Sequence, residues 1–556
     1  MSFSVRLLSP LEKVFYDDSI SVFPQYLSSS ALRGEKHSLS VLYRIDATTD
    51  IAYFDVGPTV RLSGDAAPFA KLYAVEHVPA VFAAPAYETS DGYLRDKPGL
   101  FPDVLKPIDE NTKLPSVQNV SHSLWIEIDT EKMAAGDHTV TVTFYDKNNE
   151  PLAEATHTVH IVNAVLPEQK LIVTHWLHTD CIADYYHVKV FSREHWKALE
   201  SFLRQYTSLG NNMVYTPLFT PPLDTEVGKE RTTVQLVDVE KDNECYRFGF
   251  EKLRKFIRLS LDCGVKYFEM SHLFTQWGAF FTPKIMAKVG GRTKKIFGWE
   301  TSSHSPEYEN FLSQFLPDLR EVLKEEKVAA YCYFHISDEP SKEHFESYKA
   351  CSTLLRKYLP DFPIMDAMAN VEYYDEGLVD IPIPFLGHAK PFFEHNAKPR
   401  FVYYCGASPK IMGIALGMPS TRHRISGDLF YLNNVDGFLQ WGYNFYNTCL
   451  STEHIDPYAV TDAGKRFCAG DSFHVYPGKD YTALPSIRAV VFRDGLQDMR
   501  ALTLCEELCG KEAVLTILRD ANGGELPDIF DSAPNDPYYT QTVREAVNKA
   551  IEQALQ

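Results

Sequence analysis

The sequence predicts an N-terminal β-sandwich, then a (β/α)8 barrel of the TIM type, then C-terminal helices. Residues 1 to about 165 alternate apolar and polar side chains with a period of two and show little helical periodicity. From residue 166 on, eight short apolar segments alternate with longer amphipathic ones, as such a barrel requires. Because 556 residues exceed one ordinary domain, we expect three parts: 1–165, 166–510 and 511–556.

Two segments support the sandwich. In "SLWIEID" the alternation directs Leu124, Ile126 and Ile128 inward, with Trp125 and Glu127 outward. Residues 138–162, "HTVTVTFYDKNNEPLAEATHTVHIV", contain two period-two runs around an Asp/Asn/Pro turn and predict a hairpin. Hairpins of this kind are typical of a β-sandwich.

Eight candidate strands support the barrel. They are "LIVTHW" (171–176), "NMVYTP" (212–217), "VKYFEM" (265–270), "AAYCYFHI" (329–336), "PIMDAM" (363–368), "DIPIPF" (380–385), "RFVYYC" (400–405) and "VDGFLQW" (435–441). Between them, residues 192–210 predict a helix that starts with a serine cap and ends at Gly210, and 305–327 and 341–359 are also amphipathic. The C-terminal segment 541–556 predicts a helix with one apolar stripe, formed by Val543, Val547, Ile551 and Leu555.

Composition excludes several classes of protein. A formal net charge of −19 argues against nucleic acid and anionic membrane surfaces as partners. The N-terminus lacks the apolar core of a signal peptide and no run is long enough for a membrane helix, so we expect a cytoplasmic protein. No Cys/His cluster has zinc spacing, so we expect no metal and no cofactor. The aromatic content of 13% suits carbohydrate binding, and equally a large core.

The candidate catalytic residues are Asp338 and Glu339, in "YCYFHISDEPS" at the end of the fourth strand. Active sites of this fold lie at the C-terminal ends of the strands. Neighbouring strand residues point to opposite faces, so both acids face the site only if the strand has ended. Pro340 favours such an exit and restricts Glu339 to extended conformations. The alternative is that Asp338 caps the following helix and Glu339 lies in its solvated first turn.

Two close carboxyl groups are the catalytic groups that cleavage of a glycosidic bond typically uses. Burial and a neighbouring charge raise the pKa of one of them, which gives a general acid beside a charged stabiliser. Phosphoryl transfer is not favoured, because the sequence has no P-loop and no GxGxxG. Acyl transfer by a serine elbow is not favoured either, because GxSxG is absent.

Six motifs carry a resemblance to a known family: "HISDEP", "THWLHTDCIADYY", "TPLFTPPLDT", "YFEMSHLFTQWGA", "GFLQWGYNFYN" and "GDSFHVYPG". In this order they resemble glycoside hydrolase family 123 and its uncharacterised bacterial relatives. The resemblance implies a retaining enzyme that removes terminal β-linked N-acetylgalactosamine, with the substrate's own 2-acetamido oxygen as nucleophile and an oxazolinium intermediate. It implies that Asp338 orients and stabilises the acetamido group, while Glu339 is the general acid and base.

The resemblance also implies substrate-binding residues at the other strand ends. These are His175, Asp180, His272, Gln276, Trp277, Tyr403, Trp441, Tyr443, Asn444 and Asp471. Trp441 is expected to form the floor under the sugar ring, and Tyr403 or Tyr404 to donate to the acetamido carbonyl. Core packing for the tryptophans, a loop network for the histidines and a turn-holding role for Asp471 stay open.

Two other functions stay open as well. The first is hydrolysis of another β-hexosaminide or an unusual glycan by the same pair, and the second is a non-catalytic carbohydrate-binding barrel. In each case the expected partner is a glycan or glycoconjugate that ends in N-acetylhexosamine. Whether the chain forms a homodimer also stays open.

Overall fold

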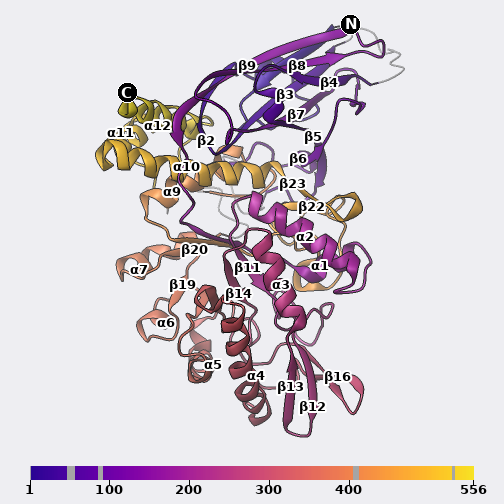
Figure 1. The fold of residues 1–556 in the computed structure, drawn as a ribbon, viewed down its shortest axis with the longest axis vertical. Helices are drawn as coiled ribbons and strands as arrows, with labels where there is room; N and C mark the ends of the chain where they lie inside the picture. The colour runs from indigo at the N-terminus through magenta and orange to yellow at the C-terminus, as the bar shows by residue number, and fades with distance from the viewer. Residues whose placement is uncertain (1, 47–56, 85–91, 405–411, 529–532) are drawn as a thin grey trace. The chain divides into compact units, whose positions relative to one another are not determined.

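The computed structural model describes residues 2–46, 57–84, 92–404, 412–528 and 533–556, which form two compact units (Figure 1). Unit 1 comprises residues 1–169, 407–433 and 484–556, and unit 2 comprises 170–406 and 434–483. The first boundary lies close to the predicted one after residue 165. The predicted barrel region 166–510, however, is interrupted, because two of its later segments belong to unit 1.

Unit 1 contains two β-sheets that share one hydrophobic core. The first has the order β1 (Ser2–Leu8), β3 (Lys36–Asp46), β7 (Ser121–Asp129), β5 (Ala70–Ala80), β6 (Gly99–Pro107), and the second β2 (Ser28–Arg33), β9 (Pro151–Val165), β8 (Gly136–Tyr145), β4 (Thr59–Ser63). The predicted hairpin is confirmed by the antiparallel pairing of β8 with β9. Leu39 and Ile126 of the first sheet and Val142 and Ile161 of the second lie in one buried cluster. In a β-sandwich the two sheets also pack face to face at a characteristic angle, so the assignment to this class stays a prediction.

The outer face of β7 differs from the prediction. Leu124, Ile126 and Ile128 are fully buried, as expected, but Trp125 is buried too, with 1% of its surface exposed. The next residue on the same face of the strand, Glu127, accepts a hydrogen bond from Arg493 of α10 (Ile487–Cys509). The sheet is therefore covered on this side by α10, and alternation alone does not mean that the second face meets solvent.

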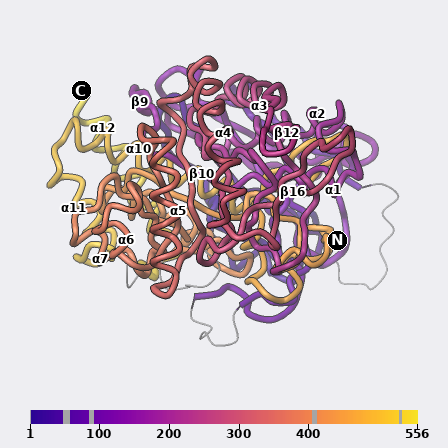
Figure 2. The backbone as a smooth tube through the Cα atoms, turned by 90° about the horizontal axis from the view of Figure 1, so that it is seen from below, coloured from indigo at the N-terminus to yellow at the C-terminus, as the bar shows by residue number. Residues whose placement is uncertain are grey.

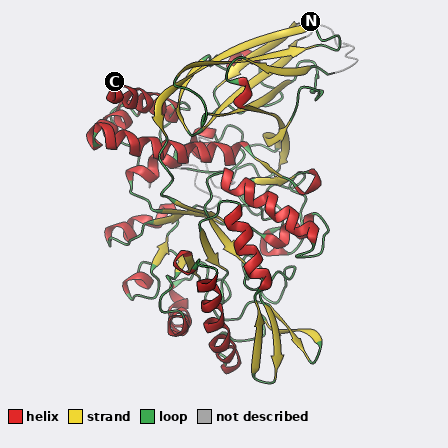
Figure 3. Cartoon of the chain, viewed as in Figure 1, coloured by secondary structure: helices red, strands yellow, loops and turns green. Residues whose placement is uncertain are grey.

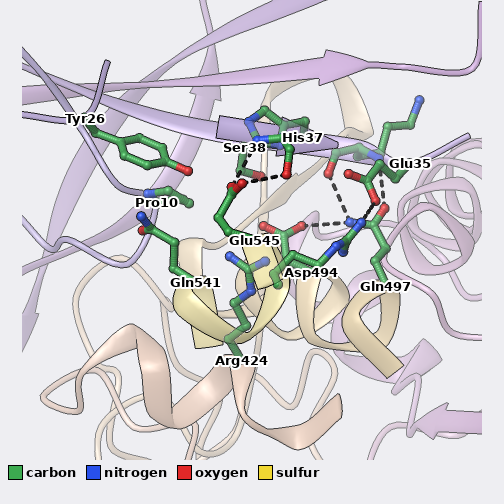
Figure 4. Close-up of a pocket in the computed structure, with 13 residues that line it drawn as sticks. Pro10, Tyr26, Glu35, His37, Ser38, Arg424, Asp494, Gln497, Gln541 and Glu545 are labelled. Carbon is green, nitrogen blue, oxygen red and sulfur yellow. Dashed lines mark hydrogen bonds and ion pairs between the residues drawn. The ribbon is translucent and has the colours of Figure 1, made fainter. Parts of the chain in front are cut away.

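A polar pocket with buried ion pairs lies between the sheets and the helices of unit 1 (Figure 4). Arg544 donates to Glu35 and, at 2.9 Å, to Asp498, and Arg424 donates to the same Asp498 at 2.6 Å. These pairs join α10 to α8 (Ser420–Arg424) and α12 (Tyr539–Leu555). The unit also contains α9 (Ser426–Leu432) and α11 (Lys511–Ala521). Breaking one such pair leaves an uncompensated buried charge, so the pairs fix how helices and sheet pack.

Unit 2 contains eight short parallel strands, each inside one of the segments predicted from sequence. They are β10 (Ile172–His175), β11 (Met213–Thr216), β14 (Tyr267–Met270), β17 (Cys332–Phe334), β18 (Met365–Ala367), β19 (Ile381–Ile383), β20 (Phe401–Tyr403) and β21 (Gly437–Gln440). Cys405, at the end of the predicted seventh strand, lies outside the described residues. The strands form three sheets, β10-β21-β20, β11-β14-β17 and β18-β19.

All eight strands contribute side chains to one hydrophobic cluster, which we call the inner face of unit 2. Single parallel bridges, Phe334 to Ile364 and Phe385 to Tyr403, link neighbouring sheets. The sheets are small, and their ladders do not close into one continuous sheet. A (β/α)8 barrel therefore stays a prediction for this unit.

Helices alternate with the strands of unit 2, as Figure 3 shows by colour. They are α1 (Thr179–Tyr185), α2 (Arg193–Ser208), α3 (Glu251–Asp262), α4 (Pro306–Glu325), α5 (Phe345–Tyr358), α6 (Glu372–Asp375) and α7 (Ala389–Glu394). The predicted cap of α2 is confirmed, because Ser192 Oγ accepts the His195 N–H at 3.2 Å. α4 and α5 run side by side in Figures 1 and 2. In the part of the chain that is described, no helix has both the length and the apolar composition needed to cross a bilayer.

A further, four-stranded sheet in unit 2 was not predicted from the sequence. Its order is β13 (Cys245–Gly249), β12 (Asp238–Asp242), β15 (Ile285–Val289), β16 (Arg292–Phe297). Gly290 and Gly291 form the β15–β16 turn with φ of 56° and 81°, a conformation that favours glycine. Two further strands are β22 (Val475–Pro477) in unit 2 and β23 (Ala483–Pro485), which spans the boundary at residue 483.

Candidate active site

Asp338 and Glu339 follow β17 and are held between the ends of two neighbouring strands. The Asp338 carbonyl accepts the Trp277 N–H at 3.0 Å, from the loop after β14. The Glu339 N–H donates to the Ala367 carbonyl at 3.0 Å, at the end of β18. The Asp338 side chain is half-buried and that of Glu339 is exposed. Main-chain bonds on both sides therefore present the two acids together, after the strand has ended.

The backbone of Glu339 is not extended, and that prediction is wrong. Its φ is +44°, in the left-handed region that costs a non-glycine residue about 1–2 kcal/mol. Pro340 disfavours the right-handed helical conformation before it, and the bond to Ala367 holds the left-handed turn. The helix-cap alternative does not fit either, because Ser341 is the N-cap of the next helical turn, Lys342–His344.

The two carboxyl groups have different surroundings. Burial, followed by the charges of Glu339 and Asp366, raises the pKa of Asp338 well above its usual range. Among the described residues none donates a hydrogen bond to the Asp338 carboxylate. Glu339 Oε1 instead accepts a hydrogen bond from the Tyr403 hydroxyl at the end of β20. An extra proton on the pair is therefore favoured on Asp338 when no ligand is present.

A buried ion-pair cluster on the inner face lies next to this pair. His335 Nε2 donates to Glu269 Oε1 at 2.6 Å, and His335 Nδ1 donates to Asp366 Oδ1 at 2.9 Å. All three side chains have no exposed surface. Burial alone lowers the pKa of His335, but the hydrogen bonds and charges of Asp366 and Glu269 raise it to about 10. The ring is therefore an imidazolium at neutral pH.

The remaining oxygens of both carboxylates are also satisfied. Glu269 accepts from Trp176 Nε1 at 2.6 Å and from Thr174 Oγ1 at 2.7 Å. Asp366 Oδ2 accepts the Ile336 N–H at 2.9 Å, the Ser337 N–H at 3.3 Å and the Tyr348 hydroxyl at 2.6 Å. A buried charge is tolerated when its lone pairs are filled in this way.

His272, a predicted substrate-binding residue, lies beside this cluster on the inner face. Its Nδ1 is 2.9 Å from the Tyr215 hydroxyl, and its ring stacks on His335 with centroids 4.2 Å apart. His272, His335 and Asp366 offer ligand atoms within 4.8 Å of one another, the spacing of a metal site. Both ring nitrogens of His335 donate to carboxylates, however, and a protonated histidine is no ligand. The residues fit an ion pair better than a metal.

Asp180 forms a buried ion pair and does not lie with Asp338 and Glu339. Arg231 donates to its two oxygens at 2.8 and 2.9 Å, and the two side chains are 2% and 1% exposed. Arg231 also donates to the Leu223 carbonyl at 3.1 Å and lies 3.1 Å from His178 Nδ1. This pair anchors the long loop after β11 to the start of α1.

Three other predicted site residues are buried away from the pair. His175 points opposite to Thr174 and packs against His474 and Phe438. The Tyr443 hydroxyl donates to the Phe202 carbonyl of α2 at 3.1 Å. Asn444 forms a two-bond bridge with the main chain of His178, at 2.8 and 3.0 Å. Tyr443 and Asn444 thus have polar contacts, and His175 has ring contacts, that maintain the fold around the strand ends.

Trp441, Asp471, Gln276 and Trp277 lie in loops of unit 2 beyond its parallel strands, Gln276 and Trp277 after β14 and Trp441 directly after β21. Trp441 is half-buried on the inner face, and its Nε1 donates to Asp471 Oδ2 at 3.2 Å. Gln276 Nε2 donates to the Thr225 carbonyl at 3.3 Å, in the loop that carries Asp224. Trp277 is 41% exposed and is the residue whose N–H binds the Asp338 carbonyl. Burial raises the pKa of Asp224 to about 6.

Glu269, His335 and Asp366 were not predicted, although the sequence contains a signal for them. Glu269 and Asp366 interrupt the otherwise apolar strands "YFEM" and "PIMDAM", and His335 ends "CYFH". A charged residue inside a buried strand needs a partner of opposite charge. A search for such interruptions, rather than for residues after strand ends, would have found all three.

Comparisons with known proteins give a family and a fold. The model of the family described as "Glycoside hydrolase 123, catalytic domain" matches residues 176–505. A solved family 123 glycoside hydrolase from Clostridium perfringens is similar over 99% of this chain and 98% of its own, with 17% identity and a TM-score of 0.74. Bacteroides uniformis β-glucuronidase 3 matches over 89% of this chain and 51% of its own, at 11% identity. Its TM-score of 0.30 is too low to indicate a shared fold. No curated protein matches the chain.

The Asp180–Arg231 pair predicts a stability effect. In Asp180→Ala, Arg231 keeps a buried charge without its partner, so the free energy of unfolding falls by about 3–5 kcal/mol. The double variant Asp180→Ala/Arg231→Met removes both charges and recovers part of that loss. Urea unfolding followed by circular dichroism measures both. An Asp180→Ala protein that keeps its stability but binds sugar poorly contradicts the structural role.

Proposed function

Because the chain belongs to glycoside hydrolase family 123, we propose that it removes terminal β-linked N-acetylgalactosamine with retention of configuration. The enzyme is a glycoside hydrolase, and the proposal concerns its substrate, its mechanism and its residues. The single observation that carries it is the adjacent pair Asp338–Glu339, held by main-chain bonds at neighbouring strand ends. We further propose that the eight parallel strands of unit 2 form the catalytic barrel.

In the proposed reaction the 2-acetamido oxygen of the substrate attacks the anomeric carbon and forms an oxazolinium ion. Asp338 accepts the acetamido N–H and stabilises the positive charge that develops on it. Glu339 donates a proton to the leaving oxygen and then removes one from the incoming water. Substrate-assisted enzymes are exempt from the usual spacing of two carboxyl groups, so adjacency is compatible with retention.

The protonation of the pair fits this division of roles once the sugar is bound. Without ligand, the proton is favoured on Asp338, which is less exposed than Glu339. An acetamido N–H that donates to Asp338 favours its ionised form, and the proton is then available to Glu339. Substrate binding therefore assigns the acid and the charged stabiliser.

Aromatic side chains that follow β14 and β21 support the proposal of a sugar site. We propose Trp441 as the floor under the N-acetylhexosamine, with the exposed Trp277 as a second ring surface beside the pair. We propose Tyr403, already bonded to Glu339, as a donor to the substrate. The solved Clostridium perfringens relative is described in connection with glycolipid glycan hydrolysis, and glycolipid glycans are the substrate class that we propose for this chain.

A substrate panel tests the proposed function. We expect hydrolysis of an aryl β-N-acetylgalactosaminide and no turnover of the unacetylated aryl β-galactoside, because the nucleophile is the acetamido group. Release of the aryl alcohol measures both. A preference for the N-acetylglucosaminide supports hydrolysis of another β-hexosaminide instead. Glycan binding without hydrolysis of any member contradicts the proposal and favours the non-catalytic alternative.

Two variants separate the roles of the pair. Glu339→Gln is expected to lose at least about 100-fold in kcat on poor leaving groups and much less on activated aryl groups, which need little protonation. Asp338→Asn is expected to slow both classes, because it removes the charge that stabilises the oxazolinium ion. Steady-state kinetics on a leaving-group series measures this. Parallel losses for both variants across the series count against the assignment.

The pH dependence of the wild-type enzyme tests the proposed proton exchange. The acid limb of kcat/KM reports the free enzyme, in which the pKa of Asp338 is raised, and the acid limb of kcat reports the complex. Because the acetamido N–H stabilises ionised Asp338, we expect the acid limb of kcat at a lower pH than that of kcat/KM. Coincident acid limbs, measured on an activated aryl substrate, do not agree with the exchange.

A further inference from the structure

His335 combines a buried charge with a place in the chain close to the catalytic pair. It precedes Asp338 by three residues, and its ring bonds Glu269 at 2.6 Å and Asp366 at 2.9 Å. Glu269 lies in β14, Asp366 lies in β18 and His335 directly follows β17. These strands are adjacent, because β14 pairs with β17, and Phe334 of β17 forms a bridge to Ile364 just before β18. The stability of a buried, hydrogen-bonded ion pair depends strongly on its geometry, so this cluster has one favoured arrangement.

Every residue from His335 to Glu339 is held by a hydrogen bond. Asp366 Oδ2 accepts the N–H groups of Ile336 and Ser337. Ser337 Oγ donates to the Thr275 carbonyl at 2.9 Å and accepts the Gly278 N–H at 3.2 Å. The main-chain bonds of Asp338 and Glu339 to Trp277 and Ala367 complete the series. The position of the catalytic pair thus depends on the carboxylate that His335 orients.

The charges around Asp338 are mostly negative. The groups that face it are Glu339, Asp366, Asp224 and His335, with the neutral Tyr215 hydroxyl. The groups that face His335 are Glu269, Asp366, Asp338 and the neutral His272. Among the groups around Asp338, His335 is the positive one. A cation here favours an ionised Asp338, the form that the proposed reaction needs.

We propose that His335 is a positioning residue of the reaction: held between Glu269 and Asp366, it fixes the segment that carries Asp338 and Glu339 and supplies a positive charge that favours the ionised form of Asp338 when the substrate is bound. The inference rests on the proposed function, because it assigns the charge state of Asp338 in that reaction. His335 does not touch the substrate. It acts through Asp366 and through the field at Asp338.

Two charge changes of opposite sign test this proposal. Asp366→Asn removes a negative charge near Asp338, while His335 keeps Glu269 as a partner, so the acid limb of kcat/KM moves down by about 1 pH unit. His335→Asn/Glu269→Gln removes the positive charge without leaving Glu269 ionised and alone, so the acid limb moves up by a similar amount. Tyr348→Phe is the matched control, since it removes a hydrogen bond of Asp366 at 2.6 Å without changing any charge, and its limb stays within about 0.3 unit.

Shifts in opposite directions support the proposal, and shifts in the same direction or none overturn it. A loss of activity without a shift indicates a purely structural role and also overturns it. If the wild-type chain hydrolyses no β-hexosaminide, the proposed function fails. The ion-pair cluster of Glu269, His335 and Asp366, which we call the clamp, is then tested by unfolding. The raised pKa of His335 means that its charge stabilises the fold fully below pH 6.5, and this stabilisation is lost as the pH rises through about 10. The double variant must lack that loss, and a pH dependence equal to that of the wild type overturns the clamp.

Discussion

The ion-pair cluster of Glu269, His335 and Asp366 is the interaction on which the site of unit 2 depends. Three charged side chains without exposed surface are tolerated only if every lone pair and proton is matched. Their hydrogen-bond partners come from β10, from the residues that follow β10 and β17, and from α5, so the cluster fixes how these elements meet. The segment that leads to Asp338 and Glu339 is hydrogen-bonded directly to one of these carboxylates, that of Asp366.

Much of this fold was predictable from hydrophobic pattern. Each of the eight parallel strands of unit 2 lies inside its predicted segment, because a short apolar run between helical patterns has few other interpretations. The sheet β13-β12-β15-β16 was not predicted because β12 and β16 are charged on both faces, although the Gly290–Gly291 turn was a usable signal. The return of residues 407–433 and 484–556 to unit 1 has no local signature, since it depends on long-range packing.

The candidate site was predictable in part. Asp338 and Glu339 lie after the end of β17, but the left-handed backbone of Glu339 depends on a hydrogen bond to another strand, which sequence does not reveal. The predicted set of site residues ignores the alternation of side chains along a strand, which directs neighbouring residues to opposite faces. Thr174 and Trp176 point to the inner face, whereas His175 between them packs against His474. Asp180 and Asn444 likewise have structural partners.

The central claim is that neighbouring acids share one sugar and divide its chemistry between the amide and the leaving group. The most direct measurement is a crystal structure with an N-acetylgalactosamine thiazoline, which mimics the bound oxazolinium ion. The account predicts Asp338 within hydrogen-bonding distance of the thiazoline nitrogen and Glu339 beside the anomeric carbon, with Trp441 against the apolar face of the ring. A thiazoline bound elsewhere, or bound with both acids turned away from it, would contradict the account.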